Sequence, residues 1–370
     1  MREVTASAPA KVNLILRAGA PAPDGYHPLV TVFEALDLRD TVTARTARAP
    51  GIRVRTRVHR PDGSLDEELS RALDADPGRH LAVRAAHALQ RLAAAGPWAQ
   101  TAAGLVLEVD KRIPVAGGMA GGSADAAATL VACNDLWGLG LTAAQLQQIG
   151  RTLGADVPAC LAGGLTLGTG RGDRLRLLRS GLPSVPMSAG VSSSSMETGA
   201  PSCPALPSDE GAHAWILALS SEGLSTPAVF RELDAGGGPG RRWTDLAEPG
   251  DELLTRLAGP ASALAGALVN DLEGPALRLR PDLRATMGAA RRAGAADVVL
   301  SGSGPTVAAL ARYAAQADSL AEAWRAELDA VAAGAPGDGA APRVADVIVA
   351  GGPAQGARIE AESDSAGGRD

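Results

Sequence analysis

The sequence predicts an α+β protein of two domains. The chain has 370 residues, which is enough for two domains of ordinary size. Hydrophobic residues make up 46% of the chain and aromatic residues only 2%, so we expect a core built from Ala, Leu and Val. Strand and helix patterns follow one another in runs, which argues against a doubly wound parallel sheet.

The first part of the chain is predicted to form strands and then a helix. Apolar strands are expected at residues 12–16 and 30–38, and residues 52–58 alternate between two faces. Residues 79–92 have helical spacing with one apolar side. An alternating strand at 105–109 follows.

The most informative segment is a loop of small residues that leads into a predicted helix at 124–137. The loop consists of Pro114, Val115, Ala116, Gly117, Gly118, Met119, Ala120, Gly121, Gly122 and Ser123. Such a loop lets the backbone approach a bulky anion, and the helix start adds free N–H groups and the positive end of the helix dipole. This arrangement predicts a phosphate site. The alternative is a Gly-rich turn before a core helix, since the lysine of a Walker A motif is absent and no GxGxxG occurs.

The rest of the chain is predicted to begin with a helix at 142–153 and a hairpin at 166–178. Residues 181–212 are rich in Ser, Pro and Gly and lack periodicity, which predicts a solvated insertion. Further strands are expected at 215–219, 298–300, 306–310 and 344–349, and further helices at 227–233, 251–257, 282–293 and 314–331. We therefore predict an N-terminal domain at 1–165, a C-terminal domain at 166–350 and a disordered tail at 351–370.

Composition excludes several classes of function. The net charge of −6 and the lack of a basic block argue against a nucleic-acid partner. Cys133, Cys160 and Cys203 fit neither a disulfide framework nor a metal site, so we expect a cytoplasmic location. The N-terminus has no apolar leader, and no apolar run is long enough to cross a membrane.

Two segments near the N-terminus carry candidate site residues. Lys11 and Asn13 lie two apart on a predicted strand and so point to the same face. An exposed polar face is the alternative explanation. The turn at Asp24 presents Tyr26 and His27, although an ordinary Asp-Gly turn explains the same residues.

Two later segments are also candidates. Asp156 lies between a helix end and an apolar stretch, where a carboxylate needs a partner or serves as a helix cap. A second small-residue loop lies between two predicted strands, where it approaches a phosphate or simply closes a hairpin. It contains Ser301, Gly302, Ser303 and Gly304.

Taken together, these motifs stand in the order and approximate spacing of the GHMP small-molecule kinases, which the chain resembles from about residue 5 to about residue 350, apart from 181–212. Lys11-Val-Asn, Gly-Tyr-His27 and Gly154-Ala-Asp-Val-Pro resemble the branch that acts on 4-diphosphocytidyl-2-C-methylerythritol (CDP-methylerythritol). The resemblance implies a two-domain GHMP kinase fold. Its N-terminal domain would resemble domain 2 of ribosomal protein S5, and its C-terminal domain would be ferredoxin-like.

The resemblance also implies a reaction, in which ATP phosphorylates the 2-hydroxyl of CDP-methylerythritol in the non-mevalonate route to isoprenoids. Asp156 would take the hydroxyl proton, and Lys11 would stabilise the charge that develops. Residues 114–123 would bind ATP with Mg²⁺, and Ser123 is a candidate metal ligand. Asn13, Tyr26, His27, Thr226 and Phe230 would bind the substrate, and Ser301, Gly302, Ser303 and Gly304 would lie near the phosphates. A core position for Phe230 is the alternative.

Some residues depart from the pattern of that branch. Ala120 stands where glycine is usual and is expected to alter the loop, and Ala124 replaces a hydroxyl-bearing residue. His80 stands where asparagine is common near adenine. The alternatives are a GHMP kinase of homoserine or mevalonate type and an inactive nucleotide-binding relative. We expect small-molecule partners only, and a monomer or homodimer.

Overall fold

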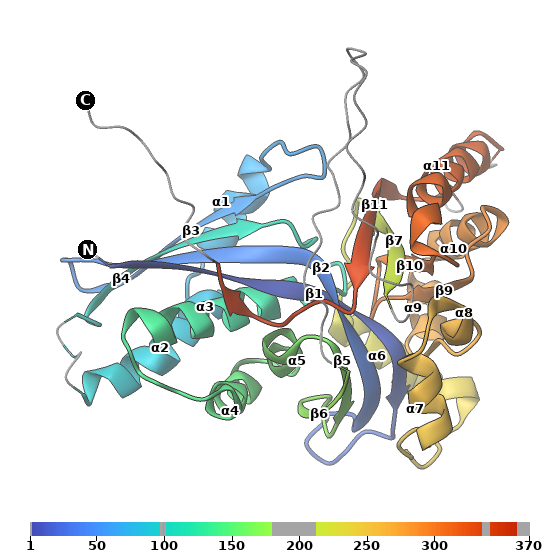
Figure 1. Ribbon diagram of the computed structural model, residues 1–370. Helices are drawn as coiled ribbons and strands as arrows, with labels where there is room; N and C mark the ends of the chain where they lie inside the picture. Colours follow the sequence, from blue (N-terminus) through green and yellow to red (C-terminus); the bar gives the residue numbers. More distant parts are fainter. Residues whose placement is uncertain (1, 97–98, 100, 180–211, 335–340, 361–370) are drawn as a thin grey trace, which may run out of the picture.

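The molecule is built on two β-sheets that stand at an angle to each other (Figure 1). The computed structural model describes residues 2–96, 99, 101–179, 212–334 and 341–360. The predicted insertion at 181–212 lies outside these residues, apart from residue 212. In the part of the chain that is described, no helix has the length and hydropathy needed to span a membrane.

A long antiparallel hairpin of β1 (Glu3–Ala18) and β2 (Leu29–Thr46) forms the centre of the first sheet. The predicted strands at 12–16 and 30–38 are confirmed as parts of this longer pair. The pairing register shifts between Pro9 and Ala10 and again between Asn13 and Ile15. Such bulges re-aim side chains, and these two flank the candidate residues Lys11 and Asn13.

The other strands extend this hairpin on both sides. β4 (Gly104–Lys111) pairs with one half of β2 and carries the parallel strand β3 (Gly51–Val58). β5 (Leu165–Thr169) pairs with the other half of β2 and forms the predicted hairpin with β6 (Arg174–Arg179). Helices pack mainly on one face of the sheet (Figure 1). They are α2 (Leu81–Ala94), α3 (Gly121–Leu136), α4 (Ala143–Leu153) and α5 (Val157–Ala162), with α1 (Glu67–Asp74) beside β3.

The second sheet has the antiparallel order β11-β7-β10-β9. Its strands are β7 (His213–Ser220), β9 (Asp297–Leu300), β10 (Val307–Leu310) and β11 (Val344–Gly352). Its helices are α6 (Thr226–Ala235), α7 (Asp251–Leu257), α8 (Ala261–Leu264), α9 (Glu273–Leu279), α10 (Asp282–Arg292) and α11 (Ala317–Gly334). In chain order, helices α6 to α10 follow the first strand, β7. Strands β9 and β10 come next, and α11 precedes the last strand, β11. This order of elements is the expected ferredoxin-like arrangement.

The alternation of side chains along β7 joins two hydrophobic cores. Trp215 and Leu217 belong to the core that fills the first domain, whereas Ile216 and Ala218 face the core under α10 and α11. Successive strand residues point to opposite faces, so one strand with apolar residues on both faces serves both cores.

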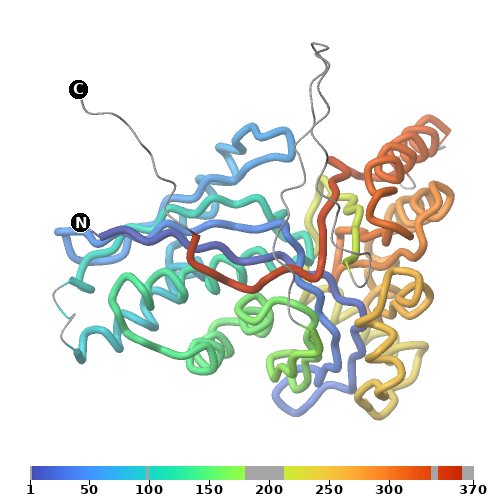
Figure 2. Tube along the Cα trace, viewed as in Figure 1, coloured from blue at the N-terminus to red at the C-terminus, as the bar shows by residue number. Residues whose placement is uncertain are grey.

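The end of the described chain corrects the predicted tail. β11 runs to Gly352, and β12 (Arg358–Ile359) pairs with β1, so the prediction of disorder is wrong for residues 351–360. Figure 2 shows this segment in red, returning across the first domain. Arg39 holds it by donating to the carbonyls of Gln355 and Gly356, both at 2.7 Å. These hydrogen bonds join a side chain to backbone carbonyls that are distant in the sequence, which composition does not reveal. Residues 361–370 lie outside the described part.

The predicted boundary between residues 165 and 166 also needs correction. β5 and β6 continue the first sheet to Arg179, and the short strand β8 (Val269–Asn270) pairs with β1 of that sheet. The first sheet therefore continues past residue 165 to Arg179 and also takes in β8, so the predicted boundary comes too early in the chain.

A buried polar network fastens the two sheets together. Glu34 of β2 is fully buried and accepts hydrogen bonds from His213 Nδ1 at 2.8 Å and from Trp215 Nε1 at 3.1 Å. His213 Nε2 lies 2.8 Å from the carbonyl oxygen of Gly259. Both ring nitrogens face acceptors, so the doubly protonated imidazolium satisfies them best. Burial lowers the pKa of His213, but the Glu34 carboxylate and the two hydrogen bonds outweigh it and raise the pKa above 6.5.

This network predicts a pH-dependent stability. A histidine whose pKa is raised by folding stabilises the fold fully below its unfolded pKa, and this stabilisation is lost as pH rises through the folded pKa. We expect the free energy of unfolding in urea to fall as the pH rises above the ordinary histidine pKa of about 6.5, and His213→Gln to remove most of that fall. His87→Gln, at an exposed position on α2, is the control and should leave it unchanged. An unaltered pH dependence in His213→Gln would contradict this assignment.

Candidate active site

A deep cleft separates the first domain from α6 and the β9–β10 loop. It has a volume of about 1670 Å³, larger than the roughly 300–1,000 Å³ of a pocket for one ligand. The whole predicted loop at 114–123 lines it, together with Lys11, Asn13, Tyr26, His27, Asp156, Thr226, Phe230, Gly302 and Ser303. Most of the predicted site residues are therefore brought to one cavity that has room for two substrates.

The small-residue loop ends in an uncapped helix. α3 begins at Gly121, and its N-cap residue Ala120 makes no side-chain hydrogen bond to the helix. Ala120 has the left-handed conformation with φ of 63°, so alanine is accommodated in a conformation that favours glycine. The first N–H groups of α3 thus have no capping side chain, and they face the cleft as an anion site.

A buried ion triad fixes the start of this loop. Lys111 Nζ lies 2.5 Å from Asp40 Oδ2 and 2.7 Å from Asp125 Oδ2. Asp40 also accepts the backbone N–H groups of Arg112 and Ile113. Burial alone would lower the pKa of Lys111, but the two carboxylates raise it above 10.5. The triad joins β2, the end of β4 and the second turn of α3.

The β9–β10 loop supports the small-residue loop from behind. Ser301 Oγ donates to the carbonyl of Gly118 at 3.1 Å, and the Thr306 N–H donates to that of Gly117 at 3.3 Å. A Cβ atom on Gly118, whose φ is +78°, would lie 2.2 Å from the Ser301 carbonyl oxygen, so this close contact requires glycine.

The four residues predicted to lie near the phosphates differ in their access to the cleft. Gly302 and Ser303 line the cleft, but Ser301 is fully buried and, like Gly304, is not part of the lining. Ser301 packs against the small-residue loop and Gly304 against Leu300 of the hairpin, so a position near the phosphates stays a prediction for these two residues. Ser301–Gly304 is both the hairpin turn and a support for the site.

Lys11 is held at the floor of the cleft. Its ammonium donates to Asn13 Oδ1 at 2.7 Å and to the Gly118 carbonyl at 2.8 Å, and it lies 3.9 Å from Asp156 Oδ2. Asn13 is oriented in turn by donating to Thr31 Oγ1 at 2.8 Å. Burial lowers the pKa of Lys11, and the nearby Asp156 only partly opposes this effect. The two residues predicted to act together are therefore in contact.

Asp156 is free to act on a ligand. It occupies the N-cap position of α5 but makes no capping hydrogen bond, which is against the alternative of a helix cap. Its side chain is 35% exposed, whereas that of Lys11 is 7% exposed. The carboxylate is thus open to the cleft, and the ammonium supports it from below.

Aromatic rings gather at the far end of the cleft. His27 stacks on Phe230 with ring centroids 5.0 Å apart, and on Trp243 at 5.4 Å. Phe230 is half-buried, packs against the second hydrophobic core and also lines the cleft, so it has both a core contact and a surface open to a ligand. Tyr26 is 56% exposed at the mouth, and the guanidinium of Arg171 lies 3.8 Å from the centre of its ring. This end can hold a flat base.

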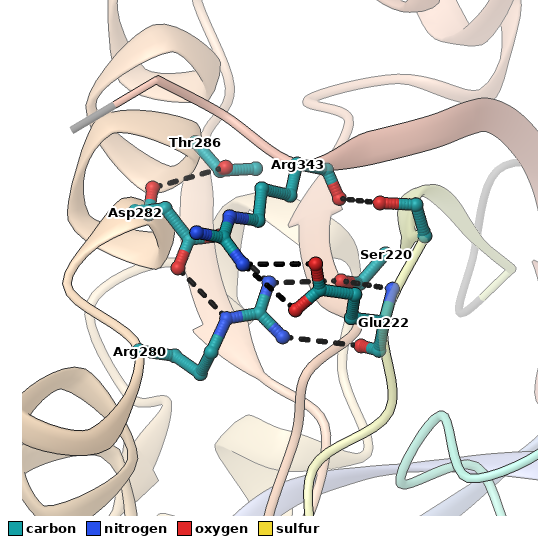
Figure 3. A network of polar contacts seen from close by, with 7 residues as sticks. Ser220, Glu222, Arg280, Asp282, Thr286 and Arg343 are labelled. Carbon is teal, nitrogen blue, oxygen red and sulfur yellow. Dashed lines mark hydrogen bonds and ion pairs between the residues drawn. The ribbon is translucent and has the colours of Figure 1, made fainter. Parts of the chain in front are cut away.

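A second polar network positions the segment between β7 and α6. Arg280 forms two hydrogen bonds of 2.8 Å with Asp282 and also donates to the Glu222 carbonyl at 3.1 Å, while Arg343 pairs with the Glu222 carboxylate (Figure 3). The following residues approach the small-residue loop. Thr226 Oγ1, at the start of α6, lies 2.7 Å from Ser303 Oγ. Thr226 thus reaches the cleft beside the β9–β10 loop.

His80 serves as a helix cap. Its Nδ1 accepts from the Ala82 N–H at 3.3 Å at the start of α2, and its Nε2 lies 3.1 Å from Thr56 Oγ1. Burial, with a smaller effect of Lys111, lowers the pKa of His80, which favours the neutral ring. Both ring nitrogens are engaged by the protein, so His80 shapes this end of the cleft and has no free donor for a base.

Several functional residues were not predicted. Asp40 and Asp125 hold Lys111, and the fact that the chain has only two lysines was the one indication of its importance. Asp234 lies four residues after Phe230 on α6, a spacing that puts both on one helix face. Trp243 follows α6 in an irregular segment, and nothing in the local sequence indicates its contact with His27.

Two parts of the chain match known protein families. Residues 80–164 match the family described as GHMP kinases N terminal domain, and residues 252–330 match GHMP kinases C terminal. A 4-diphosphocytidyl-2-C-methyl-D-erythritol kinase of Streptomyces coelicolor is 43% identical over 326 residues, which cover 87% of this chain and 92% of the relative. One of Rhodococcus jostii is 40% identical over 97% of this chain and 95% of its own length.

Solved structures show the same similarity. A crystal structure of 4-(cytidine 5'-diphospho)-2C-methyl-D-erythritol kinase has 29% identity and a TM-score of 0.60, and the match covers 94% of this chain and 98% of that one. A homoserine kinase from Cytophaga hutchinsonii matches with a TM-score of 0.61 at 19% identity, covering 97% and 98% of the two chains. The second likeness shows a shared fold alone.

The two lysines are predicted to respond differently to removal of their charge. Lys111→Met leaves the buried Asp40 and Asp125 without their cation, so we expect it to lower the free energy of unfolding in urea by about 3–5 kcal/mol. Lys11→Met removes an ammonium whose pKa folding lowers, so it should cost much less stability. Equal losses in the two variants would contradict a structural role specific to Lys111.

Proposed function

The chain belongs to the GHMP kinases and, within them, to the 4-diphosphocytidyl-2-C-methyl-D-erythritol kinases, and we propose that its cleft brings ATP to the 2-hydroxyl of CDP-methylerythritol over Lys11 and Asp156. The resemblance, the two-domain fold and the small-molecule kinase activity expected from the sequence are confirmed. The observation that carries the proposal for the site is the 3.9 Å contact between the Lys11 ammonium and the exposed Asp156 carboxylate, beside the uncapped start of α3.

Asp156 is the proposed base. Its Oδ2 would take the proton of the 2-hydroxyl as that oxygen attacks the γ-phosphorus of ATP and the bond to ADP breaks. A base of this kind contributes about 10²–10⁴-fold to the rate. Lys11, which Asn13 and the Gly118 carbonyl hold in place, would stabilise the negative charge on the attacking oxygen and the transferring phosphoryl group. Phosphoryl transfer asks mainly for such positioning and charge neutralisation.

ATP is proposed to place its phosphates on the small-residue loop. The N–H groups at the start of α3 would bind phosphate oxygens, and residues 114–123 would line the nucleotide. Mg²⁺ would arrive as the magnesium complex of ATP. The described residues contain no cluster of three acidic, histidine or cysteine ligands, which fits a metal held largely by phosphate oxygens and water. The Ser123 hydroxyl lines the cleft and is the proposed protein ligand.

The substrate is proposed to lie across the aromatic end of the cleft. Tyr26 and Phe230 would cover the faces of the cytosine ring, and His27 would contact its edge. Thr226 and Asn13 also line the cleft and would approach the diphosphate and the methylerythritol hydroxyls, respectively. Because Asn13 Oδ1 is occupied by Lys11, only its amide N–H groups are available for that contact.

Other functions are less well supported. A homoserine kinase shares the fold, but relatives of about 40% identity are diphosphocytidyl-methylerythritol kinases. An inactive nucleotide-binding relative has no physical need for a buried ammonium beside an exposed carboxylate. We propose a cytoplasmic location, because Cys133 and Cys160 are free thiols and ATP is the phosphoryl donor.

The role of Asp156 is tested by Asp156→Asn. With CDP-methylerythritol and Mg-ATP, we expect ADP formation to fall by about 10²–10⁴-fold, because the amide cannot accept the proton. ATP binding, measured by calorimetry, should be unchanged. Asp135→Asn is the control, since Asp135 is an exposed residue paired with Arg2. A normal rate in Asp156→Asn would exclude Asp156 as the base.

The role of Lys11 predicts an alkaline limit to activity. Burial lowers the pKa of Lys11, so kcat/KM should fall with rising pH before the ordinary lysine value of 10.5 is reached. The pKa of Lys111 is raised, so Lys111 does not titrate in this window. Lys11→Arg, which stays charged, should be slower but should lose this limb of the pH profile. An unchanged alkaline limb in Lys11→Arg would show that another group causes it.

A further inference from the structure

The last described residues of the chain cross the helix that follows Asp156, and the proposed transfer step gives them no role. Residues 353–360, which we call the C-terminal strap, run from the end of β11 through β12 and pass beside α5 (Figure 1). We propose that Arg39, by holding this strap against the end of α5, is a positioning residue that keeps Asp156 in place for phosphoryl transfer. This inference rests on the proposed function for the role of Asp156 as the base.

The strap meets the end of α5 through backbone hydrogen bonds. The Ala357 N–H donates to the Cys160 carbonyl at 2.9 Å, and the Gly164 N–H, just after the helix, donates to the Ala354 carbonyl at 2.7 Å. A helix leaves its last carbonyls without a partner of its own, and in a helix of six residues these are most of the carbonyls. The strap therefore supplies the partner that the Cys160 carbonyl lacks within α5.

Two glycines permit this close crossing. A Cβ atom on Gly163, the residue that ends α5, would lie 2.0 Å from the Gly356 nitrogen. A Cβ atom on Gly356 would lie 2.2 Å from the Leu161 carbonyl oxygen. Both neighbours are backbone atoms, which cannot rotate away as a flexible side chain does. A shift of the strap therefore displaces the end of α5 or breaks the hydrogen bonds between them.

Arg39 is the side chain that fixes the strap at this crossing. Its guanidinium donates to the carbonyls of Gln355 and Gly356, the two residues against which Gly163 packs, and to Ser7 Oγ of β1 at 2.7 Å. The planar fork of arginine holds several acceptors at once in a fixed geometry, whereas the ammonium of lysine is a compact charge on a flexible stem. Arg39 thus ties the strap to the central hairpin of the first sheet.

One residue connects this crossing to the proposed base. Cys160 accepts from the strap through its carbonyl and donates through its N–H to the Asp156 carbonyl at 3.1 Å. The Asp156 side chain makes no capping hydrogen bond, and its ion pair with Lys11 is long at 3.9 Å, so the backbone of α5 largely determines where the carboxylate lies. Misplacement of a reacting group by about 1 Å costs about 10²-fold in rate. A displaced strap should therefore slow the reaction without touching a ligand.

The alternative is that the strap only stabilises the fold. The side chains of Val157, Pro158, Ala159 and Cys160 are buried, so packing also holds α5. The two roles differ in one measurable respect. A loss of stability lowers activity in proportion to the fraction of unfolded chains, whatever residue stands at position 156. A positioning effect disappears once the base itself has been removed.

The test is a double-mutant cycle between the strap and Asp156. Gly356→Ala places a Cβ atom against the Leu161 carbonyl, and Arg39→Lys loosens the strap from the other side. With CDP-methylerythritol and Mg-ATP, we expect each to lower kcat by on the order of 10- to 100-fold. Calorimetric binding of a non-hydrolysable ATP analogue should be unchanged. In an Asp156→Asn chain, neither substitution should lower the residual rate further.

Each substitution has a matched control away from the cleft. Gly250→Ala adds a Cβ atom that meets no described atom within 4 Å. Arg256→Lys alters a guanidinium that also donates to two backbone carbonyls, those of Ala263 and Ala265, and that does not line the cleft. Both controls should keep the wild-type kcat. Thermal unfolding checks that every variant is folded at the assay temperature, and Arg39→Lys carries the test if Gly356→Ala does not fold.

The outcomes separate this inference from the proposed function. A wild-type kcat in either folded variant, beside a large loss in Asp156→Asn, would refute the positioning role alone. The same fractional loss in the Asp156→Asn chain as in the wild-type chain would also refute it, since that indicates general damage. Weaker binding of the ATP analogue would move the effect to the small-residue loop and contradict the inference. A normal rate in Asp156→Asn alone would refute the proposed base, and this inference with it.

Discussion

The carbonyl oxygen of Gly118 is the point on which the site depends. It accepts from the Lys11 ammonium and from Ser301 Oγ, so one atom joins the small-residue loop, the lysine of β1 and the second domain. The close approach of the Ser301 backbone leaves no space for a side chain at Gly118. A shift of the loop would move Lys11 away from Asp156, because the ammonium lies only 2.8 Å from the Gly118 carbonyl oxygen and 3.9 Å from Asp156 Oδ2. Positioning of this kind is what phosphoryl transfer requires.

The two lysines show how burial has opposite consequences in different surroundings. Lys111 is enclosed by Asp40 and Asp125, so its charge is stabilised and it supports the loop. Lys11 has one carboxylate at 3.9 Å and two neutral acceptors, and burial prevails. An incompletely neutralised ammonium is suited to a site where negative charge develops during the reaction. Lys111 is less suited to stabilise further negative charge, because two carboxylates already surround its single positive charge.

Most of the fold could be predicted because its elements have strong local patterns. The helix predicted at 142–153 is α4, which has a capping box between Thr142 and Gln145 and ends at Gly154. Among the site residues, Lys11 and Asp156 were predictable only from motif order, since they are distant in the chain. The triad of Lys111, the network of His213 and the packing of Trp243 depend on tertiary contacts without a local pattern. The return of residues 351–360 depends on backbone groups, which is why the predicted tail was wrong.

Ala120 shows why a departure from glycine need not change the site. A left-handed alanine costs roughly 1–2 kcal/mol relative to an unstrained residue, and Ala116, with φ of 55°, is a second one in the same loop. The surrounding contacts are sufficient to hold this conformation. The buried side chain of Met119 anchors the loop, the Lys11 N–H donates to the Met119 carbonyl, and the Ala124 N–H donates to that of Ala120. Strain of this kind persists where neighbours determine the backbone, and here it turns the chain so that the first N–H groups of α3 face the cleft.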